Sequence, residues 1–308
     1  MRRTGVLLVA AVTVVAATLI VSGAFMTDPW SVGTKVPAGG PLPLAVEPDP
    51  EDTPDDLNAP PMALAPPGGA IVQQGVVRIP KPKLEANAPR RVGIQIGHWK
   101  TDEVPKEYGA RILAQTGTSW AGINEVDVSM DIAERMAALL GAQGITVDIL
   151  PTTVPEGYLA DVFIAVHSDG DGVGELSGFK MAHGSRRGPY EDALLADVKS
   201  AYAKSTGLDY DATHISRNML GYFAFNWGRF QHATSPFTPA VIIEMGFLSN
   251  DDDRSLLVDE PDRIATGITN GILKFLDETP RSKIFGEDLL IPAGPFRQGP
   301  VASPSPKG

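Results

Sequence analysis

The chain has 308 residues, of which 43% are hydrophobic, so it is long enough to enclose a sizeable hydrophobic core. Its formal net charge of −11 argues against a nucleic-acid binder, because such a protein needs a basic surface to meet the phosphate backbone. The absence of cysteine excludes disulfide bonds and thiolate metal sites, so any metal ion must be held by histidine and carboxylate side chains.

The first residues place Arg2 and Arg3 before an uncharged apolar run from residue 5 to residue 26. This layout is typical of a signal peptide with small residues near its cleavage site. The run also approaches the roughly 20 residues that span a bilayer, so residues 5–26 are alternatively an uncleaved membrane anchor with its amino end in the cytoplasm. Both interpretations of residues 1–27 predict that the rest of the chain is exported.

Two further segments are rich in proline. Residues 28–90 contain about half of the prolines in the chain and the acidic stretch EPDPEDTPDD, without sustained periodicity, which predicts an extended acidic linker. Residues 280–308 are predicted to form a Pro/Gly-rich tail. The remaining residues, 91–279, have the length of a single domain.

Strand and helix patterns alternate within residues 91–279. Continuous apolar runs predict strands, and apolar residues three and four positions apart predict helices. In chain order we expect a strand at 91–96, a helix at 124–144, strands at 145–150, 161–167 and 178–183, a helix at 190–207, a strand at 240–243 and a helix at 261–278. This order predicts an α/β fold: a single three-layer domain with a mostly parallel central sheet covered by helices on both faces.

Two of these helices have a well-defined apolar face. In the helix at 124–144 the face consists of Val128, Ile132, Met136, Leu139 and Leu140. In the helix at 261–278, which begins with Pro261, it consists of Ile264, Ile268, Ile272 and Phe275. Both helices are therefore expected to pack on the sheet.

Four chemically active side chains stand at the boundaries of these elements. His98 and Glu244 each follow a predicted strand, His167 is the last residue of one, and Glu125 opens the first helix behind Asn124, a candidate N-cap. Ligands of parallel sheets bind where the carboxyl ends of the strands meet, so we expect the four side chains to converge. Two imidazoles and one carboxylate leave zinc a position for water, as in hydrolytic zinc sites, and a nearby carboxylate can accept the proton of that water.

Each of these residues also has a simpler interpretation. A histidine at the end of a strand is often an ordinary core or surface residue, and Glu125 suits a helix N-terminus by its charge alone. Glu244 has Arg217 and Arg254 as alternative salt-bridge partners. The prediction of a metal site therefore depends on all four groups converging. The remaining histidines, which follow no central strand directly, are His183, His214 and His232.

The order of these residues resembles that of the zinc-dependent N-acetylmuramoyl-L-alanine amidases of the Amidase_3 type, which are bacterial cell-wall hydrolases. The resemblance covers most of residues 92–276 and is carried by IGH, by NE at the start of a helix, by ADVFIAVHSDG and by PAVIIEMGFLSN, in which EMGFLSN is the most specific part. It implies that His98, Glu125 and His167 bind one Zn²⁺ ion and that Glu244 is the catalytic carboxylate.

The resemblance also implies a reaction and a location. The substrate would be peptidoglycan, cut at the amide bond between the lactyl group of N-acetylmuramic acid and the L-alanine of the stem peptide. Glu244 would accept a proton from water and return it to the leaving amine. The enzyme would act in the extracytoplasmic cell envelope of a bacterium, secreted or anchored to the membrane. Asn226 and His232 are candidates for substrate contacts, without a matched motif.

Twenty-six residues, Trp99 to Asn124, separate His98 from Glu125. They are expected to form a surface loop, and the alternative is a lid over the cleft. Two other functions stay open. A zinc carboxypeptidase or other peptidase would use the same ligands, and a non-catalytic wall-associated module would bind no zinc. A polysaccharide deacetylase is disfavoured, because its paired aspartates and H-x-x-x-H pattern are not visible.

Overall fold

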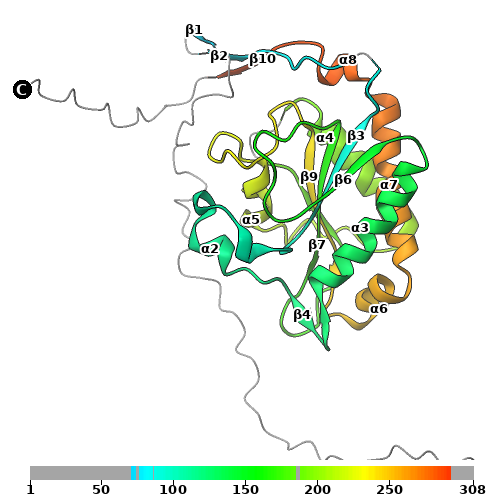
Figure 1. The fold of residues 1–308 in the computed structure, drawn as a ribbon. Coiled ribbons are helices and arrows are strands. Elements are labelled where there is room, and N and C mark those ends of the chain that lie inside the picture. The colour runs from blue at the N-terminus through cyan, green and yellow to red at the C-terminus, as the bar shows by residue number, and fades with distance from the viewer. Residues whose placement is uncertain (1–70, 74–75, 86, 185–187, 293–308) are drawn as a thin grey trace, which may run out of the picture. The chain divides into compact units, whose positions relative to one another are not determined.

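The computed structural model of the chain describes residues 71–73, 76–85, 87–184 and 188–292 (Figure 1). The predicted signal peptide or anchor at 1–27, most of the predicted linker and the end of the predicted tail lie outside these residues. Within the described part of the chain, no helix combines the length and the apolar character needed to cross a bilayer.

The centre of the domain is a five-stranded sheet. Its strands are β3 (Arg91–Ile96), β6 (Thr146–Leu150), β7 (Val162–Asp169), β8 (Lys180–Ala182) and β9 (Ala240–Phe247), in the spatial order β6-β3-β7-β9-β8. The strands β6, β3, β7 and β9 pair in parallel with one another in this order, and β8 pairs with β9 antiparallel. The predicted α/β fold with a mostly parallel central sheet is confirmed, and all five strands lie where apolar runs predicted them.

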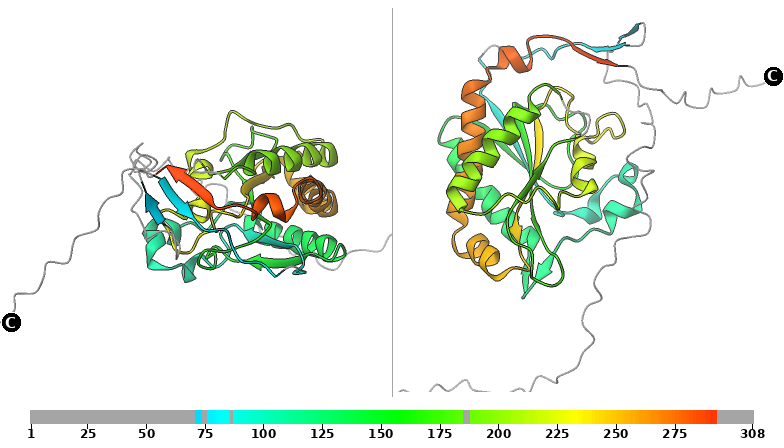
Figure 2. Two further views of the ribbon diagram at one scale, coloured as in Figure 1. Left: turned by 90° about the horizontal axis from the view of Figure 1, so that it is seen from above. Right: turned by 180° about the vertical axis from the view of Figure 1, so that it is seen from behind.

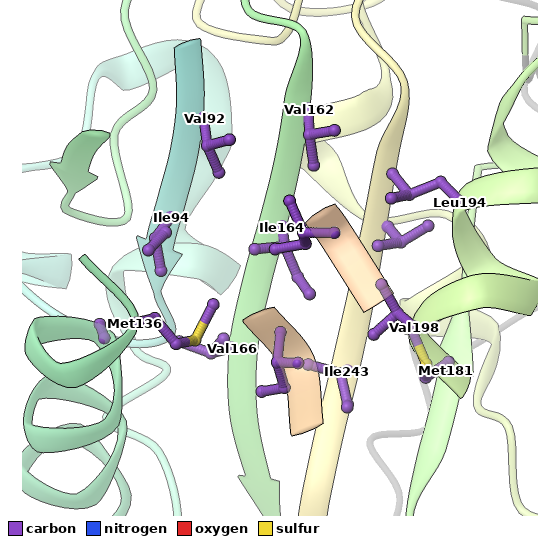
Figure 3. Close-up of a cluster of buried hydrophobic side chains, with 14 of the residues drawn as sticks. Val92, Ile94, Met136, Val162, Ile164, Val166, Met181, Leu194, Val198 and Ile243 are labelled. Carbon is purple, nitrogen blue, oxygen red and sulfur yellow. The ribbon is translucent and has the colours of Figure 1, made fainter. Parts of the chain in front are cut away.

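Three long helices cover one face of this sheet: α3 (Glu125–Gly141), α4 (Glu191–Thr206) and α7 (Pro261–Glu278) (Figures 1 and 2). Figure 3 shows apolar side chains of β3, β7 and β9 between α3 and α4, among them Ile164, Val166 and Ile243. The predicted apolar face of α7 is fully buried. That of α3 is buried except for Leu139, which is 40% exposed on the outer side of the helix. A short helix, α6 (Asp251–Asp259), leads from β9 to α7.

Short elements cover the opposite face. They are the 3₁₀ turns η1 (Thr101–Glu103) and η2 (Lys106–Tyr108), the helices α2 (Gly109–Leu113) and α5 (Arg217–Leu220), and the turn η3 (Phe223–Phe225). A second core lies beneath them and is rich in aromatic residues, namely Tyr108, Tyr158, Phe163, Tyr222, Phe223, Phe225 and Phe230. Successive residues of a strand point to opposite faces, so Gln95, His167 and Glu244 lie on this second face.

Folded structure extends past both ends of the predicted domain. A small antiparallel sheet joins β1 (Ile71–Gln73) and β2 (Val76–Ile79) from the predicted linker to β10 (Leu289–Pro292) from the predicted tail. Val77 and Ile79 alternate with exposed residues and are buried, which gives β2 the pattern of a half-buried strand. The short helix α8 (Arg281–Ile284) precedes β10.

A buried carboxylate fastens this extension to the main sheet. Asp161, just before β7, is 1% exposed and accepts hydrogen bonds from the backbone N–H of Arg91 at 2.8 Å, from Arg90 Nη1 at 2.8 Å and from Arg281 Nε at 2.7 Å. Burial alone would raise the pKa of Asp161, but the hydrogen bonds from Arg281 and Arg91 and the charge of the arginines hold it below its ordinary value.

We expect Asp161→Asn to lower the free energy of unfolding by about 2–3 kcal/mol, because it leaves partly buried arginines without their counter-charge. Since the folded pKa is depressed, this contribution is present above the ordinary pKa of 3.8 and is lost as pH falls through the folded value. Urea denaturation at pH 7 and at pH 3 measures both effects. Asp262→Asn, which breaks an exposed ion pair with Arg135, is the control and should change stability by less than about 1 kcal/mol. Equal losses in the two variants would contradict the prediction.

Candidate metal centre

Neighbouring strands bring the predicted residues into one row. In the parallel pair of β7 and β9, His167 is opposite Glu244, and in the antiparallel pair of β8 and β9, Lys180 is opposite Glu244. His98 follows β3 after Gly97, with a positive φ of 61° that is uncommon for a residue other than glycine. The strands that carry His167 and Glu244 are longer than predicted, because β7 continues to Asp169 and β9 continues to Phe247. His167 and Glu244 therefore lie within strands and not beyond their ends.

His98, Glu125 and His167 converge, as the sequence predicted. One ligand atom from each lies within 4.8 Å of the other two, and among the described residues this is the group of three metal-ligating side chains that the structure assembles. Glu125 Oε1 is 2.9 Å from His167 Nδ1 and 3.6 Å from His98 Nε2. Glu125 and His167 are 3% and 5% exposed, while His98 is at the rim.

Backbone groups orient two of these three side chains. The Nδ1–H of His98 donates to the carbonyl of Gln115 at 3.2 Å, which leaves Nε2 free to act as a ligand. Glu125 Oε2 accepts from the backbone N–H of Thr118 at 2.8 Å, and Oε1 accepts from that of Ser168 at 3.2 Å. Gln115 and Thr118 belong to the segment between His98 and Glu125. This segment therefore supports the site through its backbone, and the choice between a surface loop and a lid stays a prediction.

Glu125 is the first residue of α3, where the helix dipole favours a negative charge. Asn124 occupies the predicted N-cap position. Its side chain donates to Asp127 at 3.0 Å, however, and the predicted hydrogen bond to a backbone N–H is not formed. Burial raises the pKa of Glu125, but the hydrogen bond from His167, the charges of both histidines and the Thr118 N–H outweigh it and hold the pKa below its ordinary value. Glu125 is therefore kept ionised, as a metal ligand must be.

Glu244 stands beside this cluster in a different environment. Its Oε2 is buried and has no hydrogen-bond partner among the described residues. Burial raises the pKa of Glu244 to about 8, against the opposing charge of His167. The alternative partner Arg254 instead binds Asp251 at 2.5 Å and the carbonyl of Leu248 at 2.8 Å. A carboxylate with an unsatisfied oxygen and a pKa near neutrality is suited to proton transfer.

The donor set fits zinc. Two imidazoles and one carboxylate suit Zn²⁺, and three protein ligands leave a coordination position for the reaction. The unpartnered oxygen of Glu244 gives the site a further polar atom in need of a partner. The residues present therefore satisfy the requirements of one zinc ion, with His98, Glu125 and His167 as the residues that would hold it.

The remaining histidines lie elsewhere. Each pairs with a carboxylate: His183 with Asp192, His214 with Asp211, and His232 with Glu107. Asn226, a predicted substrate contact, closes a turn in which its carbonyl accepts from the N–H groups of Arg229 and Phe230.

Sequence reasoning missed Tyr222, whose hydroxyl lies 3.0 Å from His167 Nε2. The only signal was the density of aromatic residues in the stretch GYFAFNW, which has no strand or helix periodicity.

Position 97 must be a glycine, because the imidazole ring of His167 lies close to its backbone. A Cβ atom at this position would overlap the imidazole ring of His167. We expect Gly97→Ala to displace the ring and weaken zinc binding by at least about tenfold, the scale seen when the support of a ligand is disturbed. Competition with a chelator measures the affinity. Gly141→Ala, at a position with open space around it, is the control and should bind zinc as wild type does. Unchanged affinity in Gly97→Ala would contradict the assignment of His167 as a ligand.

A mostly parallel α/β sheet with two histidines and a glutamate gathered beside a buried carboxylate defines a candidate metal-dependent hydrolase. Residues 92–274 match the family model of N-acetylmuramoyl-L-alanine amidase, Amidase_3, and the chain belongs to this family. It is accordingly an amidase that acts on peptidoglycan. No curated protein sequence matches the chain.

Solved structures of amidases are similar to the described domain. The N-acetylmuramyl-L-alanine amidase Ami1 from Mycobacterium smegmatis has 20% identity and a TM-score of 0.48, with 62% of this chain and 99% of that chain covered. The catalytic domain of CwlV from Bacillus (Paenibacillus) polymyxa var. colistinus has 22% identity and a TM-score of 0.41, with the same coverage. The N-acetylmuramoyl-L-alanine amidase from Clostridium difficile 630 has 18% identity and a TM-score of 0.44, again with 62% and 99% covered.

Proposed function

We propose that the amidase reaction takes place at the metal centre of His98, Glu125 and His167, with one zinc ion, and that Glu244 is its general base and acid. The single observation that supports this most strongly is the pairing of Glu244 with His167 on adjacent strands, which sets a proton acceptor directly beside the candidate ligands. The bond cut is the amide between the lactyl carbonyl of N-acetylmuramic acid and the nitrogen of L-alanine.

When bound, zinc supplies Lewis-acid polarisation of the scissile carbonyl. Glu244 accepts one proton from the attacking water as the new C–O bond forms. It then delivers this proton to the alanine nitrogen as the C–N bond breaks, which gives a lactyl carboxylate and a free amine. A group that must both accept and donate a proton works best with a pKa near the operating pH, and burial brings the pKa of Glu244 into this range.

An ion pair lies on the other side of Glu244. Lys180, opposite Glu244 on β8, is buried, and its ammonium binds Asp169 and lies 4.9 Å from the ring centre of Phe247. After burial and the charge of His167, the largest influences on the pKa of Glu244 include Asp169, which raises it, and Lys180, which lowers it. Asp169 influences the pKa of Glu244 more than Lys180 does, so the ion pair keeps Lys180 beside Glu244 without lowering the pKa of the base overall.

The location follows from the substrate. Peptidoglycan lies outside the cytoplasm, and the apolar run within residues 1–27 has the layout of an export signal or a membrane anchor. The part of the predicted linker that precedes β1 would carry the domain away from that segment, and the predicted tail would continue past β10.

The test is product analysis. The full chain, loaded with zinc, is incubated with purified sacculi, and the soluble products are identified by mass spectrometry. Free stem peptides that begin with L-alanine support the proposal. Shortened stems still attached to sugar would show a peptidase and contradict it, and the absence of products from a chain with one bound zinc would contradict it as well.

A further inference from the structure

We infer that Tyr222 is a positioning residue of the metal centre: with Gln95 behind it, its hydroxyl sets the tautomer of His167 and so directs Nδ1 to the metal. This inference rests on the proposed function and extends it to two residues that bind neither metal nor substrate. Its basis is a chain of three hydrogen bonds that begins at the ring of His167 and ends at a backbone carbonyl.

All members of this chain are buried. Tyr222 is 9% exposed and Gln95 is fully buried in β3. His167 Nε2 is 3.0 Å from the hydroxyl oxygen of Tyr222, which is 2.8 Å from Gln95 Oε1, and Gln95 Nε2 is 2.8 Å from the carbonyl of Thr152. The ring of Tyr222 also meets that of His167 edge to face, with centres 5.5 Å apart. Both the hydroxyl and the ring therefore hold the imidazole.

The direction of each bond follows from its far end. The carbonyl of Thr152 is an acceptor only, so the side-chain amide of Gln95 must donate to it and present its oxygen to Tyr222. The hydroxyl of Tyr222 must then donate its single hydrogen to Gln95. Only a lone pair of the tyrosine oxygen remains for His167, whose Nε2 must carry a hydrogen and donate it.

This arrangement leaves Nδ1 of His167 as the ligand atom. Nδ1 faces Glu125 Oε1 at 2.9 Å and donates a hydrogen to it in the absence of metal, and this is the hydrogen that a bound ion would replace. The carbonyl of Gln115 acts on His98 in the opposite sense, because it takes the Nδ1 hydrogen and leaves Nε2. The two histidines thus present different nitrogens to the same point, and each choice is made by an acceptor outside the ligand set.

Removing the tyrosine oxygen should therefore weaken metal binding and not only folding. In Tyr222→Phe the Nε2–H of His167 is buried without an acceptor, and the ring loses its orientation. We expect the dissociation constant for zinc to rise by about 10–100-fold, the range typical of lost outer partners of metal ligands. In Gln95→Met the hydroxyl of Tyr222 is free to donate to Nε2, which favours the tautomer with hydrogen on Nδ1, and zinc affinity should also fall.

Tyr108→Phe is the matched control. Tyr108 belongs to the same aromatic core, its ring contacts Phe223, and its hydroxyl donates to the backbone carbonyl of His232. The Tyr108→Phe variant therefore loses a buried tyrosine hydroxyl that does not contact any candidate metal ligand. We expect Tyr108→Phe to lower the melting temperature of the metal-free chain while the zinc dissociation constant stays within about twofold of wild type.

The experiment measures zinc affinity of the full chain by competition with a chelator, and the ring nitrogens of His167 by ¹⁵N NMR of the zinc-loaded chain. A slowly exchanging Nε2–H in wild type that is lost in Tyr222→Phe, together with weaker zinc binding in Tyr222→Phe and Gln95→Met, supports the inference. Wild-type zinc affinity in Tyr222→Phe, or an equal loss in Tyr108→Phe, overturns it while the proposed function stands. A wild-type chain that binds no zinc overturns both.

Discussion

Glu244→Gln is expected to lower kcat on sacculi by about 10²–10⁴-fold, the contribution typical of a positioned general acid–base group. Glutamine keeps the size of the side chain but can neither accept the proton of water nor donate it to the leaving amine. Because Glu244 is outside the candidate ligand set, zinc content should stay at one ion per chain. Product release and zinc content measured on the same preparation check both statements, and loss of zinc in the variant would contradict the separate role given to Glu244.

The same substitution should stabilise the metal-free chain in a pH-dependent way. Burial raises the pKa of Glu244 from its ordinary 4.5 to about 8, so the folded chain holds this proton more tightly than the unfolded chain. Its contribution to the free energy of unfolding is therefore full below pH 4.5 and is lost as pH rises from 4.5 to 8. Thermal melts should show Glu244→Gln above wild type at pH 8, with the difference shrinking towards pH 4. A constant difference would argue against burial of this carboxylate.

Glu191→Gln is a suitable control for the measurements of activity and zinc content. Glu191 is also buried, and burial raises its pKa, but it accepts hydrogen bonds from the N–H groups of Gly188 and Tyr190 at the start of α4. It is expected to lose some stability and to keep both zinc and activity.

His98→Ala is expected to remove zinc and, with it, all measurable hydrolysis. Only Glu125 and His167 would remain of the three ligands, which is fewer than zinc sites in proteins use. Because His98 lies at the rim of the site, the variant should still fold. Metal analysis after dialysis measures the loss, and treatment of wild type with a chelator should reproduce it, with activity restored by added zinc.

His214→Ala provides the comparison, because His214 is exposed and its contacts with Asp211 and Thr213 are local. It should retain one zinc ion per chain. Full zinc occupancy in His98→Ala would show that the ligand set is different from the one proposed.

The sequence predicted the central sheet and the convergence of the three candidate ligands because each depends on local pattern. The strands that hold His167 and Glu244 are apolar throughout, and the register between them follows from parallel packing. The helix that begins at Glu125 was visible from the spacing of its buried residues. The candidate site residues could therefore be predicted from the sequence, because each stands at or near the end of a strand or the start of a helix.

The surroundings of the ligands were not accessible in this way. Gln115 and Thr118 act through their backbone, which carries no signature of residue type. Tyr222 acts from a turn that is placed by packing of aromatic side chains and not by periodicity. The strands β1 and β2 were missed because prolines around them outweigh a short alternation of apolar residues, and their partner β10 is about two hundred residues away.

The small sheet of β1, β2 and β10 lies at one end of the domain. The described chain enters at Ile71 and leaves at Pro292 on the two outer strands of that sheet, which is fastened near the amino end of β7 through Arg281 and Asp161. Asp161 and His167 stand towards opposite ends of this strand, about 20 Å apart. Both ends of the described chain therefore lie at the end of the domain opposite the candidate metal centre, so the edge that would meet the substrate is remote from both of them.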